Sequence, residues 1–238
     1  MNLQLLKELC QEFDIDLADE LYEKFSLYAG HLRTANEQMN LTALNEPDDV
    51  ALKHFFDSLL CLKLNLSYTG KELLDLGTGA GFPGMVLKLA CPDSSWTLVD
   101  SLKKRVDFLD YLKKVFDLSG LSLVHARAED LGHDSLFREK HDFVFARAVA
   151  RLPILCELCL PLLKPGGSFL ALKGPDAENE VAESENALNL LQGKVESINS
   201  FSIPRYSFVR KIIVISKTTA NDSRYPRRAG IIQKRPLL

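Results

Sequence analysis

The chain has 238 residues, of which 46% are hydrophobic and 26% charged, a composition typical of a globular protein with a sizeable core. No apolar run approaches the ~20 residues that span a bilayer, and the first residues lack the basic and apolar regions of a secretory signal, so we expect no membrane partner. Five cysteines without framework spacing indicate a reducing, cytoplasmic location.

The net charge of −3 is unevenly distributed along the chain. From Arg205 to the end there are nine lysines and arginines and one acidic residue, Asp222, a net charge of +8, so the preceding residues carry −11. A basic tail on an acidic body favours a polyanionic partner that the tail contacts. The alternative is a solvated, disordered terminus.

Residues 1–66 are predicted to form a helical extension. Apolar side chains recur there every three or four residues, at Leu17, Leu21, Phe25, Tyr28 and Leu32. Pro47 fits the first turn of a later helix. On that helix His54 and Asp57 either face a functional site or belong to an ordinary helix surface.

Residues 67–218 alternate between short apolar runs and helical segments, which predicts βαβ units and a mostly parallel sheet. The runs are ELLDL, SWTLVD, LSLVH, DFVFA and GSFLALK, followed by VESINSFSI and FVRKIIVIS. The last two lie close together in sequence, so we expect an antiparallel pair at one edge. Residues 219–238 form the basic tail.

Cys156 and Cys159 form a CxxC motif in one of the predicted helices. No second pair and no nearby histidine accompanies them, so two cysteines on a buried helix face are favoured over metal or redox chemistry. We predict no metal site.

The loop after the first strand is rich in glycine and is predicted to bind a ligand, because ligands bind beyond the carboxyl ends of the strands in open α/β sheets. Residues 79–84 fit the dinucleotide pattern GxGxxG. The alternative frame is acid-x-GxGxG, from Asp75 through Gly77 and Gly79. An acid suits the ammonium group of S-adenosylmethionine and is unfavourable beside a pyrophosphate, so Asp75 favours S-adenosylmethionine over NAD.

Polar residues after the next two strands complete a nucleoside-binding pattern. Asp100 ends the second strand and can accept both ribose hydroxyls, although this position would serve NAD equally well. Ala128 and Glu129 follow the third strand, where an adenine would lie. The alternative for Glu129 is an acid in the first turn of a helix.

Several longer segments carry a more specific combination: LLDLGTGAGFPG, LVDSLKKRVDFL, HARAEDL, DFVFARAVARL and LKPGGSFLALKG, with NLTAL, HFFDSLL and the terminal RYPRRAGIIQKRPL. Together they closely resemble the glucose-inhibited division protein B family, the RsmG-type methyltransferases. The resemblance implies a Rossmann-like class I methyltransferase fold with a seven-stranded sheet. It also implies the cofactor S-adenosylmethionine and the product 7-methylguanosine in 16S ribosomal RNA of the small subunit.

The family motifs also imply cofactor contacts at Gly77, Phe82, Ala128, Glu129 and Arg147 of this chain. Arg147 could instead contact the guanine or a phosphate, or form a structural ion pair. No catalytic acid or base is predicted, because guanine N7 carries a lone pair and no proton at neutral pH, so the enzyme's task is positioning. The adenine-type NPPY turn is absent after the fourth strand, where Ala146-Arg147-Ala148-Val149 stands.

Basic side chains are the predicted RNA contacts, with 16S ribosomal RNA or the small subunit as partner and no stable protein partner evident. They are Lys173, Arg224, Arg227, Arg228, Lys234 and Arg235. Tyr225 among them could stack on an unpaired base. Other functions stay open: a small-molecule or protein methyltransferase, which the basic tail disfavours, an NAD-dependent oxidoreductase, and a ribosomal RNA binding or assembly factor without turnover.

Overall fold

The computed structural model describes all residues from Met1 to Leu238 and contains one seven-stranded sheet, in the order β3-β2-β1-β4-β5-β7-β6. The pairs β1–β4, β2–β3 and β4–β5 are parallel, whereas β7 runs antiparallel to both β5 and β6. The expected mostly parallel sheet with an antiparallel pair at one edge is therefore confirmed.

The strands lie where the apolar runs placed them. Their bounds are β1 Glu72–Leu76, β2 Ser95–Asp100, β3 Leu121–His125, β4 His141–Arg147, β5 Leu163–Lys173, β6 Gly193–Ile203 and β7 Phe208–Lys217. The first three match the sequence-based prediction to the residue. The later strands extend beyond the predicted runs: β4 by one residue at each end, β5 by four and β6 by two residues at the start, and β7 by one residue at the end.

The chain forms two compact units: residues 1–70 with 78–125, and residues 71–77 with 126–238. Each unit combines segments that are separated in the chain. The division into residues 1–66, 67–218 and 219–238 concerns separable parts of the chain, and it stays a prediction.

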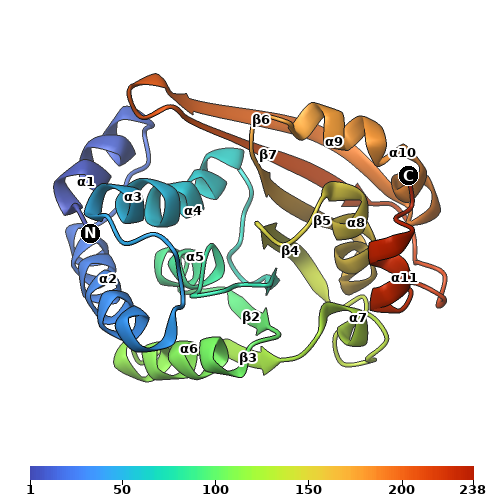
Figure 1. The fold of residues 1–238 in the computed structure, drawn as a ribbon, viewed down its shortest axis with the longest axis horizontal. Coiled ribbons are helices and arrows are strands. Elements are labelled where there is room, and N and C mark those ends of the chain that lie inside the picture. Colours follow the sequence, from blue (N-terminus) through green and yellow to red (C-terminus); the bar gives the residue numbers. More distant parts are fainter. The chain divides into compact units, whose positions relative to one another are not determined.

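The first unit holds the N-terminal helices together with strands β2 and β3. Its helices are α1 Leu3–Glu12, α2 Asp19–Met39, α3 Pro47–Val50, the π-helix η1 Ala51–Phe56, α4 Asp57–Leu59, the 3-10 helix η2 Leu60–Leu64, α5 Gly84–Ala90 and α6 Lys103–Val115. The apolar stripe is confirmed in α2, where Phe25, Tyr28 and Leu32 are buried. Helix α2 packs on α5 and α6, as Figure 1 shows in blue and green.

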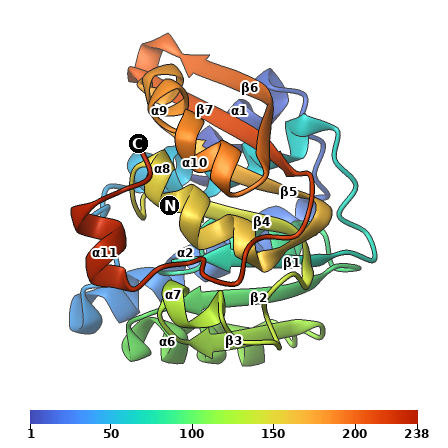
Figure 2. The same cartoon turned by 90° about the vertical axis from the view of Figure 1, so that its right-hand side faces the viewer.

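The second unit holds β1, the four strands β4 to β7 and the C-terminal residues. Its helices are α7 Ala128–Leu131, α8 Leu152–Cys159, η3 Leu160–Leu162, α9 Ala177–Glu183, α10 Glu185–Leu190, η4 Pro204–Tyr206 and α11 Ala229–Lys234. Helix α8 contacts β4, β5, α9 and α10, and the terminal α11 also packs on it (Figures 1 and 2).

The CxxC cysteines lie on α8 in the core of the second unit. Cys156 and Cys159 are fully buried, as the favoured interpretation requires, and burial raises the pKa of the Cys156 thiol to about 12. A thiol of that kind is protonated and inert at neutral pH. None of the helices combines the length and the apolar character that crossing a bilayer requires.

Candidate functional site

In the first unit, the glycine loop of residues 78–83 is held by two hydrogen bonds that the backbone N–H groups of Thr78 and Gly79 donate. The Thr78 N–H donates to the Val99 carbonyl at 2.9 Å, and the Gly79 N–H donates to Asp100 Oδ2 at 2.9 Å. Gly79 has φ +62°, and a Cβ built there would meet no heavy atom within 4 Å. The loop therefore keeps one residue without a side chain beside open space, as a close ligand approach requires.

Asp100 lies at the end of β2 and is 2% exposed. Its Oδ1 accepts the Leu102 N–H at 2.9 Å, and its Oδ2 lies 3.2 Å from an Arg105 guanidinium nitrogen as well as accepting from Gly79. The predicted bidentate ribose acceptor thus already organises the loop. Arg105 Nη1 also lies 3.5 Å from Oδ1, so donors of the protein already approach all of the roughly four lone-pair sites of this carboxylate.

Phe82 has its ring inside an aromatic cluster and is 3% exposed. The rings of His54 and Phe82 are stacked with centroids 4.3 Å apart, and Tyr28 and Phe82 are stacked at 5.4 Å. The ring of Phe82 is therefore a packing element of the loop. The interpretation of His54 and Asp57 as an ordinary helix surface is wrong, because they are 8% and 0% exposed.

In the second unit, the end of β1 meets the turn that follows β4. Asp75 is fully buried and lies in register with Phe145 of β4. A Cβ on Gly77, which has φ +71°, would lie 2.5 Å from Val149 Cγ2. Gly77 is therefore required by this close approach, so the glycines of the motif differ in what they do: Gly77 admits a neighbouring side chain and Gly79 faces open space.

Arg147 is the last residue of β4 and is half-buried. Ala148 directly after it has φ +56°, a left-handed conformation that costs a non-glycine residue roughly 1–2 kcal/mol. Such strain is common in turns that carry function. The predicted cofactor residue therefore opens a strained turn whose Val149 packs on Gly77.

Ala128 and Glu129 form the first turn of α7, so Glu129 is also an acid in the first turn of a helix, the alternative that the sequence left open. Glu129 lines a cavity of about 220 Å³ together with Asp130, Arg227 and Arg228. The second unit thus brings one predicted cofactor residue next to two predicted RNA-binding residues from the far end of the chain.

The tail of residues 219–238 is folded into the second unit, and this corrects the expectations for Arg227 and Tyr225. Glu157 is fully buried on α8 and accepts the Arg227 backbone N–H at 2.8 Å and both ends of its guanidinium, at 2.8 and 2.6 Å. Arg227 is therefore committed to Glu157 and not presented to a phosphate. Tyr225 is 6% exposed, so its ring has no free face for base stacking.

Lys173 departs from its prediction for the same reason. It is 8% exposed, and its Nζ donates to the Ala150 carbonyl at 2.8 Å and pairs with Glu180 at 2.7 Å. A lysine buried and bound in this way is not presented to an RNA. Its partner Glu180 lies on the acidic helix α9.

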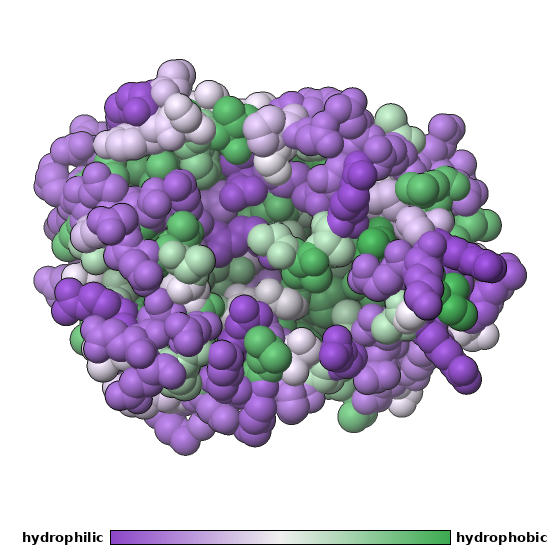
Figure 3. All heavy atoms as spheres, in the orientation of Figure 1, coloured by the Kyte–Doolittle hydropathy of each residue, from purple (hydrophilic) through white to green (hydrophobic).

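Other basic residues of the tail remain on the surface. Those exposed are Arg224, Arg228, Lys234 and Arg235. Figure 3 shows hydrophilic side chains in purple at its right-hand edge, over α11. Arg224 pairs with the nearby Asp222 at 3.0 Å, an exposed contact that costs little to exchange for a phosphate.

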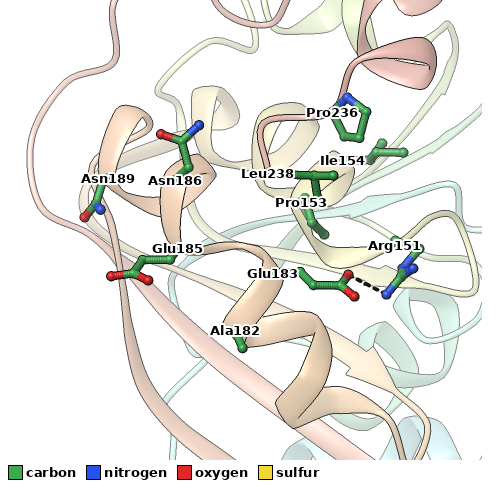
Figure 4. A pocket seen from close by; sticks show the side chains of 10 residues that line it. All are labelled: Arg151, Pro153, Ile154, Ala182, Glu183, Glu185, Asn186, Asn189, Pro236 and Leu238. Carbon is green, nitrogen blue, oxygen red and sulfur yellow. Dashed lines mark hydrogen bonds and ion pairs between the residues drawn. The ribbon is translucent and has the colours of Figure 1, made fainter.

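A larger cavity of about 570 Å³ lies between α8, α9, α10 and the C-terminal residues (Figure 4). Its floor carries Pro153, Pro236 and Leu238, and the ion pair of Arg151 with Glu183 lies at its rim. None of the predicted site residues lines it. It is therefore separate from the residues to which the motifs point.

The sequence does not single out Tyr28 and Glu157, although these two buried side chains contact the glycine loop and the tail. Tyr28 is one member of the apolar stripe of α2, and nothing in the sequence distinguishes it from the other members. Glu157 carries a weak signal: it is the only charged residue within LPILCELCLPLL, residues 152–163, and a lone charge in an apolar helix requires a buried partner.

Comparison with known proteins agrees with this arrangement. A family model described as "GidB: rRNA small subunit methyltransferase G" matches residues 21–209. The chain belongs to this family. A protein named ribosomal RNA small subunit methyltransferase G from Desulfitobacterium hafniense is 47% identical over 228 residues, covering 96% of this chain and 94% of the relative. A relative of the same name from Streptococcus pneumoniae is 43% identical over the full length of both chains.

Solved structures of low sequence identity to this chain share its fold. A SAM-dependent methyltransferase from Aquifex aeolicus has a TM-score of 0.55 at 18% identity, covering 75% of this chain and 97% of that chain. TYW2 from M. jannaschii, solved in complex with AdoMet, has a TM-score of 0.52 at 14% identity, covering 63% and 69%. The Rossmann-like class I methyltransferase fold of this family member is therefore confirmed.

Proposed function

We propose that this member of the rRNA small subunit methyltransferase G family transfers a methyl group from S-adenosylmethionine to N7 of a guanine in small-subunit 16S ribosomal RNA. The family match over residues 21–209 carries the proposal. The open space beside Gly79, in a loop that follows a buried aspartate, supports it at the level of residues.

The residues present fit the cofactor. Gly79 leaves room where a Cβ would stand. The acid-x-GxGxG segment supplies the Asp75 carboxylate for an ammonium group and contains no lysine or arginine for a phosphate. Asp100 suits a ribose hydroxyl in exchange for its long contacts with Arg105, at 3.2 and 3.5 Å, and Glu129 and the Ala128 N–H suit an adenine edge. The buried ring of Phe82 assigns any cofactor contact of this residue to its backbone.

When bound, the cofactor supplies a methyl group on a positively charged sulfur. The protein's own residues need no general base, because guanine N7 is an unprotonated lone-pair acceptor. Their contribution is alignment of the reacting atoms, which is worth up to roughly 7–11 kcal/mol when positioning is ideal. Arg147, at the strained turn after β4, is the side chain we assign to holding the cofactor or the guanine.

The exposed cations of the tail are the residues we assign to the RNA. Arg228, Lys234 and Arg235 carry the local positive charge, and Arg228 lines the cavity that Glu129 also lines. Phosphate contacts of this kind add affinity without sequence specificity. Arg227, next to Arg228, ties this part of the tail to Glu157 of α8.

The decisive test is transfer of a labelled methyl group to small-subunit RNA, followed by mapping of the modified nucleoside. We expect 7-methylguanosine at one position, and no transfer to RNA carrying 7-deazaguanine there, although that RNA should still bind. The single-turnover rate should be flat from about pH 6.5 to 9, since no titrating base takes part.

A ribosomal RNA binding or assembly factor without turnover would bind S-adenosylhomocysteine and RNA in the same experiments but transfer no label. Binding of NAD in preference to S-adenosylhomocysteine in calorimetry would contradict the whole assignment.

A further inference from the structure

The N-terminal helices contact the glycine loop within the first unit. The Tyr28 hydroxyl, on α2, donates to the Ala80 carbonyl, and the Tyr28 ring is stacked on Phe82 with an angle of 3° between the ring planes. Tyr28 is fully buried. One side chain of α2 therefore fixes both the backbone and a side chain of the loop, immediately after Gly79.

The π-helix η1 contributes a second contact. His54 is stacked on Phe82 at 4.3 Å, with 7° between the ring planes, and its Nε2 lies 2.9 Å from Thr42 Oγ1. Three consecutive side chains of η1, from His54 to Phe56, are buried. A π-helical turn is a rare departure from α-helical geometry that is frequent at functional sites.

The loop backbone approaches the neighbouring helices most closely at Gly81. Gly81 has φ +102°, and a Cβ on it would collide with the Tyr28 hydroxyl and lie 2.9 Å from Leu109 Cδ2. The loop backbone is therefore pressed against α2 and α6 at Gly81. At Gly79 it is attached to Asp100 by the backbone N–H while its Cβ direction stays open.

We propose that Tyr28 and His54 are positioning residues for the cofactor loop. By holding Ala80 and Phe82, they keep the Gly79 N–H on Asp100 and the space beside Gly79 clear. The N-terminal helices are on this account part of the cofactor-binding machinery. The inference rests on the proposed function in one respect, namely that this loop binds S-adenosylmethionine.

Removal of the Tyr28 hydroxyl tests the first contact. Tyr28→Phe should raise the Kd for S-adenosylhomocysteine about three- to tenfold, as expected for a lost buried hydrogen bond. Tyr22→Phe is the matched control: Tyr22 lies on the same helix and is buried, and its ring faces Lys7, with Nζ 5.0 Å from the ring centroid. Calorimetry measures the Kd, and thermal unfolding measures the stability of both variants.

The second contact is tested by removal and replacement of the stacked ring. His54→Ala should raise the Kd more than about tenfold, because it removes an aromatic pair and leaves a cavity beside Phe82. His54→Phe keeps a ring there and should restore the Kd to within about threefold of the wild type. His31→Ala, which removes the ring contact with Tyr111 elsewhere in the unit, is the control.

The kinetic readout separates positioning from general destabilisation. The KM for S-adenosylmethionine should rise with the Kd, while the KM for RNA and the kcat at saturating cofactor stay near wild-type values. If Tyr28→Phe and Tyr22→Phe lose the same thermal stability and neither changes the Kd, the proposal is overturned and Tyr28 is only a core residue. Failure of His54→Phe to restore binding would overturn the role of the stack.

The wild-type measurement keeps the two proposals distinguishable. A wild-type protein that does not bind S-adenosylhomocysteine contradicts the proposed function, and the positioning role with it. A wild-type protein that binds it while the Tyr28 and His54 variants bind equally well contradicts the positioning role alone.

Discussion

The glycine loop of residues 78–83 and the tail of residues 219–238 are both held by buried side chains, but by different forces. Around the loop, rings and a neutral hydroxyl make the contacts with Ala80 and Phe82, and the Asp100 carboxylate accepts the Gly79 N–H. The tail is held by charge: Arg227 pairs with Glu157, and the Arg138 guanidinium donates to the carbonyls of Asn221, Asp222 and Tyr225.

The difference matters because the two kinds of contact fail differently. Neutral packing responds weakly to salt and pH. Removing a buried group lowers the free energy of unfolding in proportion to the packing contacts that are lost. A buried ion pair contributes modestly while intact, yet removal of one partner strands the other charge in the core. The loop should therefore tolerate conservative changes, whereas the tail should not tolerate the loss of a single buried charge.

The largest effect is expected at Gly79. Gly79→Leu should abolish binding of S-adenosylhomocysteine, because the side chain would enter the open space and the residue would have to keep φ +62°. Gly166→Leu is the matched control, since Gly166 also has a positive φ and open space but lies in β5. Both variants carry backbone strain of roughly 1–2 kcal/mol, so calorimetry should show lost binding only at position 79.

Arg227→Ala should destabilise the protein by about 3–5 kcal/mol, because it leaves the fully buried Glu157 carboxylate without its guanidinium. Urea unfolding measures this loss. Arg228→Ala, its exposed neighbour, should change the stability by no more than about 0.5 kcal/mol. Adding Glu157→Leu to Arg227→Ala should recover part of the loss. Equal stability of the two arginine variants would show that the Glu157 contact is not maintained in solution.

RNA binding should depend on the exposed cations of the tail, whose loss changes the stability little. Arg228→Ala and Lys234→Ala should each lower the slope of log K against log salt by about 0.7–0.9 for each phosphate contact that is lost. Filter binding over a salt series measures this. Cofactor affinity should stay unchanged in these variants. An unaltered slope would remove the exposed tail from the RNA-binding surface.

The smallest effect is expected from acidification below about pH 4. Burial works to raise the pKa of Glu139, but the Lys217 ammonium, the Asn221 N–H and Arg138 outweigh it, and the pKa is lowered. This contribution to stability is therefore present above the ordinary glutamate pKa of about 4.3, and is lost as the pH falls through the lowered folded-state pKa. Hydrogen exchange in residues 219–238 should then accelerate, and Glu139→Gln should remove that pH dependence.

Much of the fold follows from local signals. The first three strands were predictable to the residue because each is a short apolar run bounded by polar or glycine residues, and such a pattern has few alternatives. The ligand loop was predictable because closely spaced glycines after a buried strand have few structural uses. The family likeness rests on the same contiguous motifs, and the comparisons confirmed it.

The roles of single side chains depended on residues far away in the sequence. Arg227 and Arg228 are adjacent and chemically identical, yet one is bound to Glu157, seventy residues earlier, and the other is exposed. His54 and Phe82 each look unremarkable until η1 stacks one on the other. Sequence by itself determined the strands, the glycine loop and the family, because these depend on the order of neighbouring residues. Only the tertiary structure decided which cations face solvent and which rings hold the loop, because burial and pairing depend on where the fold brings distant residues.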